Sequence, residues 1–420
     1  MNKLYAFLFA LLMTVACTPT TAPVISNAKP LTEEIVQKKP FHSGLSKEGL
    51  KRFDKFIRRE MAANKIPGSV LLIKHKGDVA YSKTYGKKNI EDDTPMQKDE
   101  LFYIQSMTKP IVSVAFMMLY EEGYFALDEP VSKYLPEFAD MKVASSHDKA
   151  SRNLVDAERL ITIEHLLTHT AGLSHGLGGS ELEKEYLEAL YLTKHKNVES
   201  RAKGLAKMPL VAQPGTKWYY SASPDILALL IEQFTGITCA EFLQKRIFDP
   251  LEMNDTGYNI KPGSESRKSY LHATKPDGTM DLNERQTPAT GHTIFGGTHG
   301  LYSTAADYMK FCEMIINDGK ANGKTLLGRK TIEMMSHNYL PEGEYSDRGK
   351  GFGLGFGVYL SSRESGLPVS EGTLDWGGAY NTYFFIDPKE ELIAVWMMQF
   401  APYTNFYSLK LRQLVGSALE

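Results

Sequence analysis

Two hairpin-like segments lie at opposite ends of the chain, and this arrangement most restricts the folds open to it. Near the start, strand-like runs at residues 69–75 and 79–85 flank a Gly-Asp turn, which is a hairpin signal. Near the end, residues 382–386 and 392–399 flank a second turn. The middle of the chain, from residue 106 to about 248, has mostly helical patterns. We therefore predict an α/β fold of the α+β type, with an antiparallel sheet built from both chain ends, flanking helices and an inserted, mostly helical lobe.

The limits of the folded part follow from helix signals at each end. Ser46 can cap a helix in which Leu50, Phe53 and Ile57 share one face, and residues 406–419 form a closing helix. We expect one domain over residues 45–420. Its sheet lobe covers about 45–105 and 290–420, and its helical lobe covers about 106–289. Small-molecule sites commonly form in the cleft between two such lobes.

The first 44 residues predict a secretion signal followed by a tether. An apolar run from Leu4 to Ala16 is too short to span about 30 Å of hydrocarbon as a helix, but it is typical of a signal peptide. It is followed directly by Cys17, and the junction resembles a bacterial lipobox, in which this cysteine is lipidated. We predict a signal peptide at residues 1–16 and a proline-containing, lipid-attached tether at residues 17–44. The alternative is an ordinary signal peptide, with Cys17 incidental.

These segments predict an exported protein. We expect a lipoprotein on the periplasmic face of a bacterial membrane, at the outer membrane, that meets the membrane only through its lipid; otherwise it is periplasmic or secreted. No later run reaches about 18 uninterrupted apolar residues, so no transmembrane helix is expected. Cys239 and Cys312 could pair once in an oxidising compartment. The net charge of −2 gives no electrostatic footprint for nucleic acid, so no nucleic-acid partner is expected.

The first motif that carries chemistry is Ser106-Met107-Thr108-Lys109, an S-x-x-K. Pro110 is tolerated in the first turn of a helix, which places the helix start near Ser106. Residues three apart share a helix face, so Lys109 should lie beside the Ser106 hydroxyl. Free N–H groups at a helix start also favour a developing oxyanion. The alternative is a capping serine beside a solvated lysine.

A serine hydroxyl becomes a good nucleophile only when a neighbouring group accepts its proton. Lys109 is one candidate, if burial lowers its pKa, and a tyrosine near a cation is the other. A Pro-Gly turn at residues 214–215 precedes Trp218, Tyr219 and Tyr220, and an apolar helix follows them. We expect a nearby ammonium to lower the pKa of such a tyrosine. These aromatic residues can alternatively be ordinary core residues.

Four stretches occur in the order found in the serine β-lactamase-related superfamily. They are residues 104–110, residues 164–172, residues 214–236 and Trp376-Gly377-Gly378. From about residue 45 to residue 420 the chain resembles the class C-like branch of that superfamily, and most of all its family VIII carboxylesterases. This resemblance implies a β-lactamase/transpeptidase-like fold.

The resemblance also implies a role for each matching residue. Ser106 is the nucleophile, Lys109 is its activator and Tyr220 is the general base, with Tyr219 as the alternative after a one-residue slip. The backbone N–H groups of Ser106 and Ala379 form the oxyanion hole. The substrate contacts the motif of Trp376, Gly377 and Gly378.

Two positions depart from the β-lactamase pattern and match the esterase branch. Ala222 stands where an asparagine usually follows the tyrosine, and Trp376 stands where a Lys-Thr-Gly motif supplies a cation. The resemblance thus implies a serine hydrolase that cleaves small carboxylic esters through an acyl-enzyme on Ser106, with no metal or organic cofactor. The alternatives are a weak class C-like β-lactamase or D-amino-acid peptidase acting on β-lactam-like substrates, and a non-enzymatic cell-wall or β-lactam sensor that remains acylated.

Three other patterns are expected to be structural. Ser174 lies in a formal G-x-S-x-G, but no strand precedes it as a nucleophile elbow requires. His165 and His169 are four residues apart without an evident third ligand, so no metal site is expected. Glycines alternate at positions 351, 353, 355 and 357, which suggests one strand packed closely against a neighbour.

Overall fold

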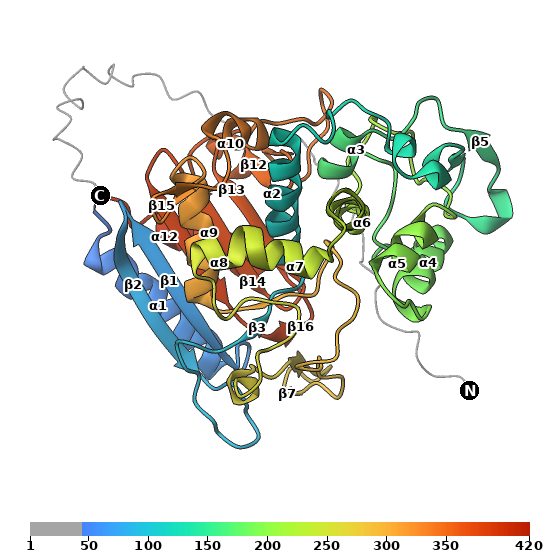
Figure 1. The fold of residues 1–420 in the computed structure, drawn as a ribbon. Coiled ribbons are helices and arrows are strands. Elements are labelled where there is room, and N and C mark those ends of the chain that lie inside the picture. Colours follow the sequence, from blue (N-terminus) through green and yellow to red (C-terminus); the bar gives the residue numbers. More distant parts are fainter. Residues whose placement is uncertain (1–43) are drawn as a thin grey trace, which may run out of the picture. The chain divides into compact units, whose positions relative to one another are not determined.

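The computed structural model describes residues 44–420, and its centre is a seven-stranded antiparallel sheet (Figure 1). Cys17, the predicted signal peptide and the predicted tether up to residue 43 lie outside the described residues. In spatial order the strands are β11 (Lys350–Phe352), β12 (Gly357–Tyr359), β13 (Leu374–Gly378), β14 (Thr382–Asp387), β15 (Leu392–Met397), β1 (Gly68–His75) and β2 (Asp78–Gly86). Both predicted hairpins are therefore confirmed, and β1 pairs with β15 to join the two chain ends.

One face of the sheet packs against the first and last helices, α1 (Lys47–Ala62) and α12 (Asn405–Gly416). Leu71 of β1 lies opposite Trp396 of β15, and both side chains are fully buried on this face. The ring of Phe53 from α1 meets Trp396 edge-on at 5.3 Å. Residues at alternate positions, such as Val395, belong to the core on the other face, as the two-residue period of a strand requires. The Ser46 hydroxyl caps α1 by accepting from the Gly49 N–H at 2.8 Å, as predicted.

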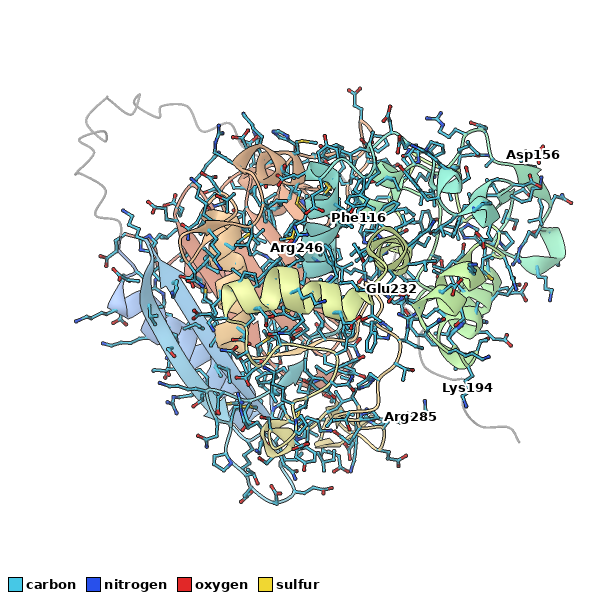
Figure 2. All side chains as sticks on the ribbon, in the orientation of Figure 1. Phe116, Asp156, Lys194, Glu232, Arg246 and Arg285 are labelled. Atoms are coloured by element: carbon cyan, nitrogen blue, oxygen red, sulfur yellow. The ribbon has the colours of Figure 1, made fainter. Side chains whose placement is uncertain are left out.

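The other face of the sheet carries the larger core, which is built on α2 (Thr108–Glu121), α6 (Ser223–Thr235) and α9 (Ala305–Ile316). Phe116 of α2, labelled in Figure 2, is fully buried in this core. Asp156, also labelled there, is exposed on the short strand β5 (Leu154–Asp156) at the periphery. α2 is apolar on nearly all sides, and this allows it to run through the interior.

The remaining elements are short and connect these layers. The helices are α3 (Ile163–Leu167), α4 (Glu181–Leu187), α5 (Val198–Leu205), α7 (Cys239–Leu243), α8 (Asp249–Leu251), α10 (Arg329–Met335) and α11 (Ser362–Ser365). The strands are β3 (Phe102–Tyr103), β4 (Lys142–Ala144), β6 (His272–Thr274), β7 (Met280–Leu282), β8 (Tyr302–Ser303), β9 (Lys320–Ala321), β10 (Lys324–Thr325) and β16 (Phe400–Ala401).

The prediction that the alternating glycines form one strand is wrong. Gly351 and Gly357 lie in the paired strands β11 and β12, and Gly353 and Gly355 lie in the turn that connects them. The expected close packing is present, because a Cβ on Gly353 would lie 2.1 Å from the carbonyl oxygen of Met335.

Two further expectations concern cysteines and membrane helices. Cys239 and Cys312 are both buried and both free in the described part of the chain. Within residues 44–420 no single helix has the length and apolar character needed to cross a membrane, although the bent pair Ser223–Thr235 and Cys239–Leu251 passes that test together.

Candidate active site

The S-x-x-K motif lies where a 3₁₀ turn, η2 (Gln105–Met107), leads into α2. Lys109 Nζ lies 3.2 Å from Ser106 Oγ, as the three-residue spacing predicts. Gln105 has a φ of +49°, in the left-handed region that side-chain-bearing residues seldom adopt. Such backbone strain is often found at functional sites. It turns the chain sharply just before Ser106, which lines a pocket of about 340 Å³.

Lys109 is buried, and a relay of backbone and side-chain contacts fixes its position. Its nitrogen also donates to the Thr298 carbonyl oxygen at 2.8 Å. The Thr298 N–H in turn donates to the carboxylate of Asp225 at 2.9 Å, and Arg201 pairs with that carboxylate at 2.7 Å. Asp225 therefore orients the peptide that holds Lys109. Burial lowers the pKa of Lys109 well below its ordinary value, with Asp225 opposing and Arg201 adding to this change.

Tyr220 lines the same pocket, whereas Tyr219 does not. The centre of the Tyr220 ring lies 4.6 Å from Lys109 Nζ and 5.5 Å from the centre of the Trp376 ring. Burial raises the pKa of the Tyr220 phenol, and the neighbouring Ser106 and Trp376 oppose that rise. The expected lowering of this pKa is therefore wrong, because desolvation outweighs the lowering by Ser106 and Trp376. Tyr219 instead faces His147, with the two rings edge-on at 6.2 Å.

His175 packs against Tyr220 in the site, although no motif in the sequence indicated it. Its ring stacks on Tyr220 at 5.0 Å with an interplanar angle of 20°. The Tyr191 hydroxyl lies 2.7 Å from His175 Nδ1 and orients the imidazole. Burial, and then the proximity of Lys109, lower the pKa of His175 well below its ordinary value. The imidazole is thus favoured in its neutral form as a packing partner.

The motif of Trp376, Gly377 and Gly378 forms the end of β13, and Ala379 follows it. All four residues line the pocket together with Ser106. A Cβ on Gly378 would lie 2.3 Å from the carbonyl oxygen of Ile104, so only glycine lets β13 approach the turn that holds the nucleophile. The Ala379 N–H has no hydrogen-bond partner among the described residues, which leaves it available as a donor.

The pocket has a volume of about 340 Å³ and contains charged groups that the sequence analysis did not place there. Lys350 from β11 and Arg412 from α12 line its wall together with Asp375 of β13. The motif of Trp376, Gly377 and Gly378 carries no cation, but the pocket around it does. Lys350, Asp375 and Arg412 are far apart in sequence, and no local motif marks them. Ala222 is fully buried at the start of α6 and does not line the pocket.

The other candidate residues take structural positions. The Ser174 hydroxyl is buried and donates to the Glu183 carboxylate at 2.6 Å, away from the pocket lining. His165 caps α3 by accepting from the Thr162 N–H, and His169 pairs with Ser221 at 2.8 Å. No group of three or more His, Cys, Asp or Glu side chains in residues 44–420 has the arrangement of a metal site.

The pocket brings together a serine next to a buried lysine, a tyrosine and the end of strand β13. This arrangement defines a serine hydrolase with the β-lactamase/transpeptidase-like fold. The chain belongs to the beta-lactamase family, whose model matches residues 53–415. The chain is an enzyme of this family, and its relatives include esterases and acyltransferases.

Individual relatives agree with this assignment. The chain is 29% identical over 357 residues to Esterase EstB of Burkholderia gladioli, a match that covers 80% of this chain and 86% of EstB. It is 28% identical over 382 residues to the monacolin J acid methylbutanoyltransferase of Aspergillus terreus, covering 83% of this chain and 90% of that protein. Among solved structures it resembles EstCE1, described as a hydrolase with promiscuous acyltransferase activity, with a TM-score of 0.77 and 23% identity. That match covers 88% of this chain and 98% of EstCE1.

Proposed function

We propose that this enzyme hydrolyses small carboxylic esters through an acyl-enzyme on Ser106. The observation that carries the proposal is the 3.2 Å contact between the buried Lys109 Nζ and the Oγ of Ser106, which lines the pocket. The identity of nearly a third to Esterase EstB supports an ester as the substrate. A lipid anchor on Cys17 and a periplasmic location remain part of the proposal.

In the first half of the reaction, Ser106 Oγ attacks the ester carbonyl and gives its proton to the pair of Lys109 and Tyr220. The carbonyl oxygen becomes an oxyanion held by the N–H groups of Ser106 and Ala379. When the tetrahedral intermediate collapses, the bond to the alcohol oxygen breaks and the pair returns the proton to the leaving alcohol. The acyl group stays on Ser106.

In the second half of the reaction, a water molecule enters the place that the alcohol has left. It attacks the acyl carbonyl while the same pair accepts its proton, and the proton then returns to Ser106 Oγ as the acid leaves. The buried lysine favours this cycle, because a lowered pKa keeps its nitrogen able to accept a proton.

Two measurements test the proposal. A hydrolysis panel should show turnover of short 4-nitrophenyl esters well above that of a cephalosporin or a D-Ala-D-Ala peptide. Intact-mass analysis should show an acyl adduct that appears on mixing with the ester, disappears as the ester is consumed, and is absent in Ser106→Ala. An adduct that persists would support the sensor, and preferred turnover of the cephalosporin or the peptide would support the β-lactamase or peptidase alternative.

A further inference from the structure

Two cationic side chains lie in the wall of the substrate pocket, although the proposed reaction on a neutral ester does not require them. Lys350 extends from β11 and Arg412 from α12, and both line the pocket that contains Ser106. Their side chains are only 12% and 5% exposed. Cations this deeply buried normally have full ionic compensation, because desolvation of a charge is costly.

The compensation comes from one buried carboxylate. Asp375 lies 2.5 Å from Lys350 Nζ and 2.9 Å from Arg412 Nη1, and its side chain is 3% exposed. The other acid that lines the pocket among the described residues is Asp347, which is exposed and therefore screened by water. One buried negative charge thus stands against one buried and one largely buried positive charge.

Lys350 retains donor capacity toward the pocket. Among the described residues, Asp375 is the one group that its nitrogen contacts as an ion pair, whereas an ammonium has three N–H donors. The nitrogen otherwise lies over aromatic faces, 5.3 Å from the centre of the Trp376 ring and 5.6 Å from that of Tyr359. Arg412 donates from Nη2 to the hydroxyl of Ser408, which also lines the pocket.

The position of this cationic pair relative to the reacting atoms is defined by Trp376. Tyr220 packs against the indole at 5.5 Å, and Lys350 lies against the same indole at 5.3 Å. A substrate that lies along Trp376 therefore reaches the nucleophile at one point and the ammonium at another. Because a single excess positive charge is buried there, an anionic group on the substrate would complete the ion pairing.

We propose that the preferred substrates are esters that carry a carboxylate, which pairs with Lys350 and Arg412 while the ester carbonyl lies at Ser106. This inference rests on the proposed ester hydrolysis and names its substrate class. Lys350 and Arg412 act as specificity residues, and the reacting atoms do not contact them. A purely structural role, joining β11, β13 and α12, would affect folding without changing the choice between anionic and neutral esters.

Two matched pairs of esters test the inference. Mono-4-nitrophenyl glutarate and 4-nitrophenyl valerate differ by a carboxylate at the end of the acyl chain. 3-Acetoxybenzoate and 3-methylphenyl acetate differ by a carboxylate on the alcohol side. After division by each ester's hydroxide-catalysed rate, the kcat/KM of the intact enzyme should favour the anionic member of at least one pair by about tenfold to a hundredfold, as expected for a charge-assisted contact. A ratio of one or less in both pairs would overturn the proposal.

Variants test whether the Lys350 ammonium causes the preference for anionic esters. Lys350→Met leaves Asp375 and Arg412 as a one-to-one pair, so the fold should persist, and the anionic preference should fall by about tenfold or more. Lys350→Arg should retain it, because the charge is kept. Lys389→Met is the matched control, since this lysine is exposed in the turn between β14 and β15, and the ratio should not change. A full preference in Lys350→Met would contradict the assignment.

A binding measurement separates this inference from the proposed reaction. If the intact enzyme hydrolyses no ester, ester hydrolysis fails, but calorimetry on Ser106→Ala still reports recognition. The dissociation constant for mono-4-nitrophenyl glutarate or 3-acetoxybenzoate should be at least tenfold lower than that of its neutral partner, and Lys350→Met in the same background should abolish the difference. Equal dissociation constants in both pairs would overturn the inference whether or not esters are hydrolysed.

Discussion

Lys109 Nζ lies 4.6 Å from the centre of the Tyr220 ring, and burial shifts the pKa values of these two groups in opposite directions. The pKa of the lysine is lowered and that of the tyrosine is raised, so both shifts favour the uncharged forms. Next to Ser106, burial thus shifts Lys109 toward the amine and Tyr220 toward the phenol. In the proposed reaction, the amine is then the immediate proton acceptor and the phenol can pass a proton to the leaving alcohol.

The nucleophile is tested by a pair of serine variants. Ser106→Ala should abolish ester hydrolysis, whereas Ser174→Ala should retain its turnover per folded molecule. Ser174→Ala should nevertheless lower the free energy of unfolding by about 1–3 kcal/mol, because it removes the donor to the buried Glu183 carboxylate. Hydrolysis rates and urea unfolding measure both effects. An inactive Ser174→Ala beside an active Ser106→Ala would contradict the assignment.

Local signals predicted much of the fold. The cap at Ser46 and the two hairpins each depend on residues close in sequence, and each is present. The contact between Ser106 and Lys109 is also local, because one helical turn separates them. The alternating glycines were wrongly predicted to form one strand, because close packing and a tight turn both favour glycine. Sequence alone does not separate these two causes.

Two features of the site depend on tertiary structure. The pKa of Tyr220 is set by burial, which becomes known only when the surrounding segments are packed. The charged group of Lys350, Asp375 and Arg412 unites three elements, and no spacing rule links such positions. The sequence around Lys350 and Arg412 does not distinguish them from ordinary surface lysines and arginines, so their place in the pocket could not be predicted.

The roles of the adjacent tyrosines are separated by removing one hydroxyl at a time. Tyr220→Phe should lower kcat for short esters by about 10²- to 10⁴-fold, the usual contribution of a positioned acid–base group. Tyr219→Phe should change kcat little, because Tyr219 lies against His147 and outside the pocket lining. Steady-state kinetics on the same ester give both values. A larger loss in Tyr219→Phe would transfer the role to that residue.

The buried Lys109 predicts a specific dependence of stability on pH. Its folded-state pKa is lowered, so between that value and the unfolded value of about 10.4 the unfolded chain binds more protons than the folded one. The free energy of unfolding should therefore rise with pH in this window, by up to about 1.4 kcal/mol per pH unit from this group. Urea unfolding at pH 7 and pH 9 should show that Lys109→Met loses this slope. Lys389→Met should keep it, and an unchanged slope in Lys109→Met would show that the lysine is not neutral when folded.

The proposed anchor depends on one cysteine that lies outside the described residues. Radiolabelled palmitate should be incorporated into the unmodified protein expressed in a bacterial host and should be absent from Cys17→Ser. The variant should also leave the membrane fraction, since the lipid is the proposed anchor. An unlabelled protein that is free in the periplasm would contradict the lipid anchor and would leave the proposed ester hydrolysis unaffected.

Discrimination against β-lactams should be smaller than the sequence alone implied. The sequence indicated two missing partners, an amide at Ala222 and a cation at Trp376. Lys350 and Arg412 supply cations to the pocket, so only the partner at Ala222 is still missing. An unmade hydrogen bond of this kind costs about 1–3 kcal/mol, which corresponds to about tenfold to a hundredfold in rate. We therefore expect kcat/KM for a short 4-nitrophenyl ester to exceed that for a cephalosporin by about this factor.

A simpler β-lactam tests whether Ala222 is the cause. 7-Aminocephalosporanic acid lacks the side-chain amide that an asparagine would bind, so it has no such bond to lose. Its kcat/KM should be close to that of the acylated cephalosporin. A much lower value would show that another group of the pocket binds the amide, and cephalosporin turnover equal to ester turnover would favour the β-lactamase alternative.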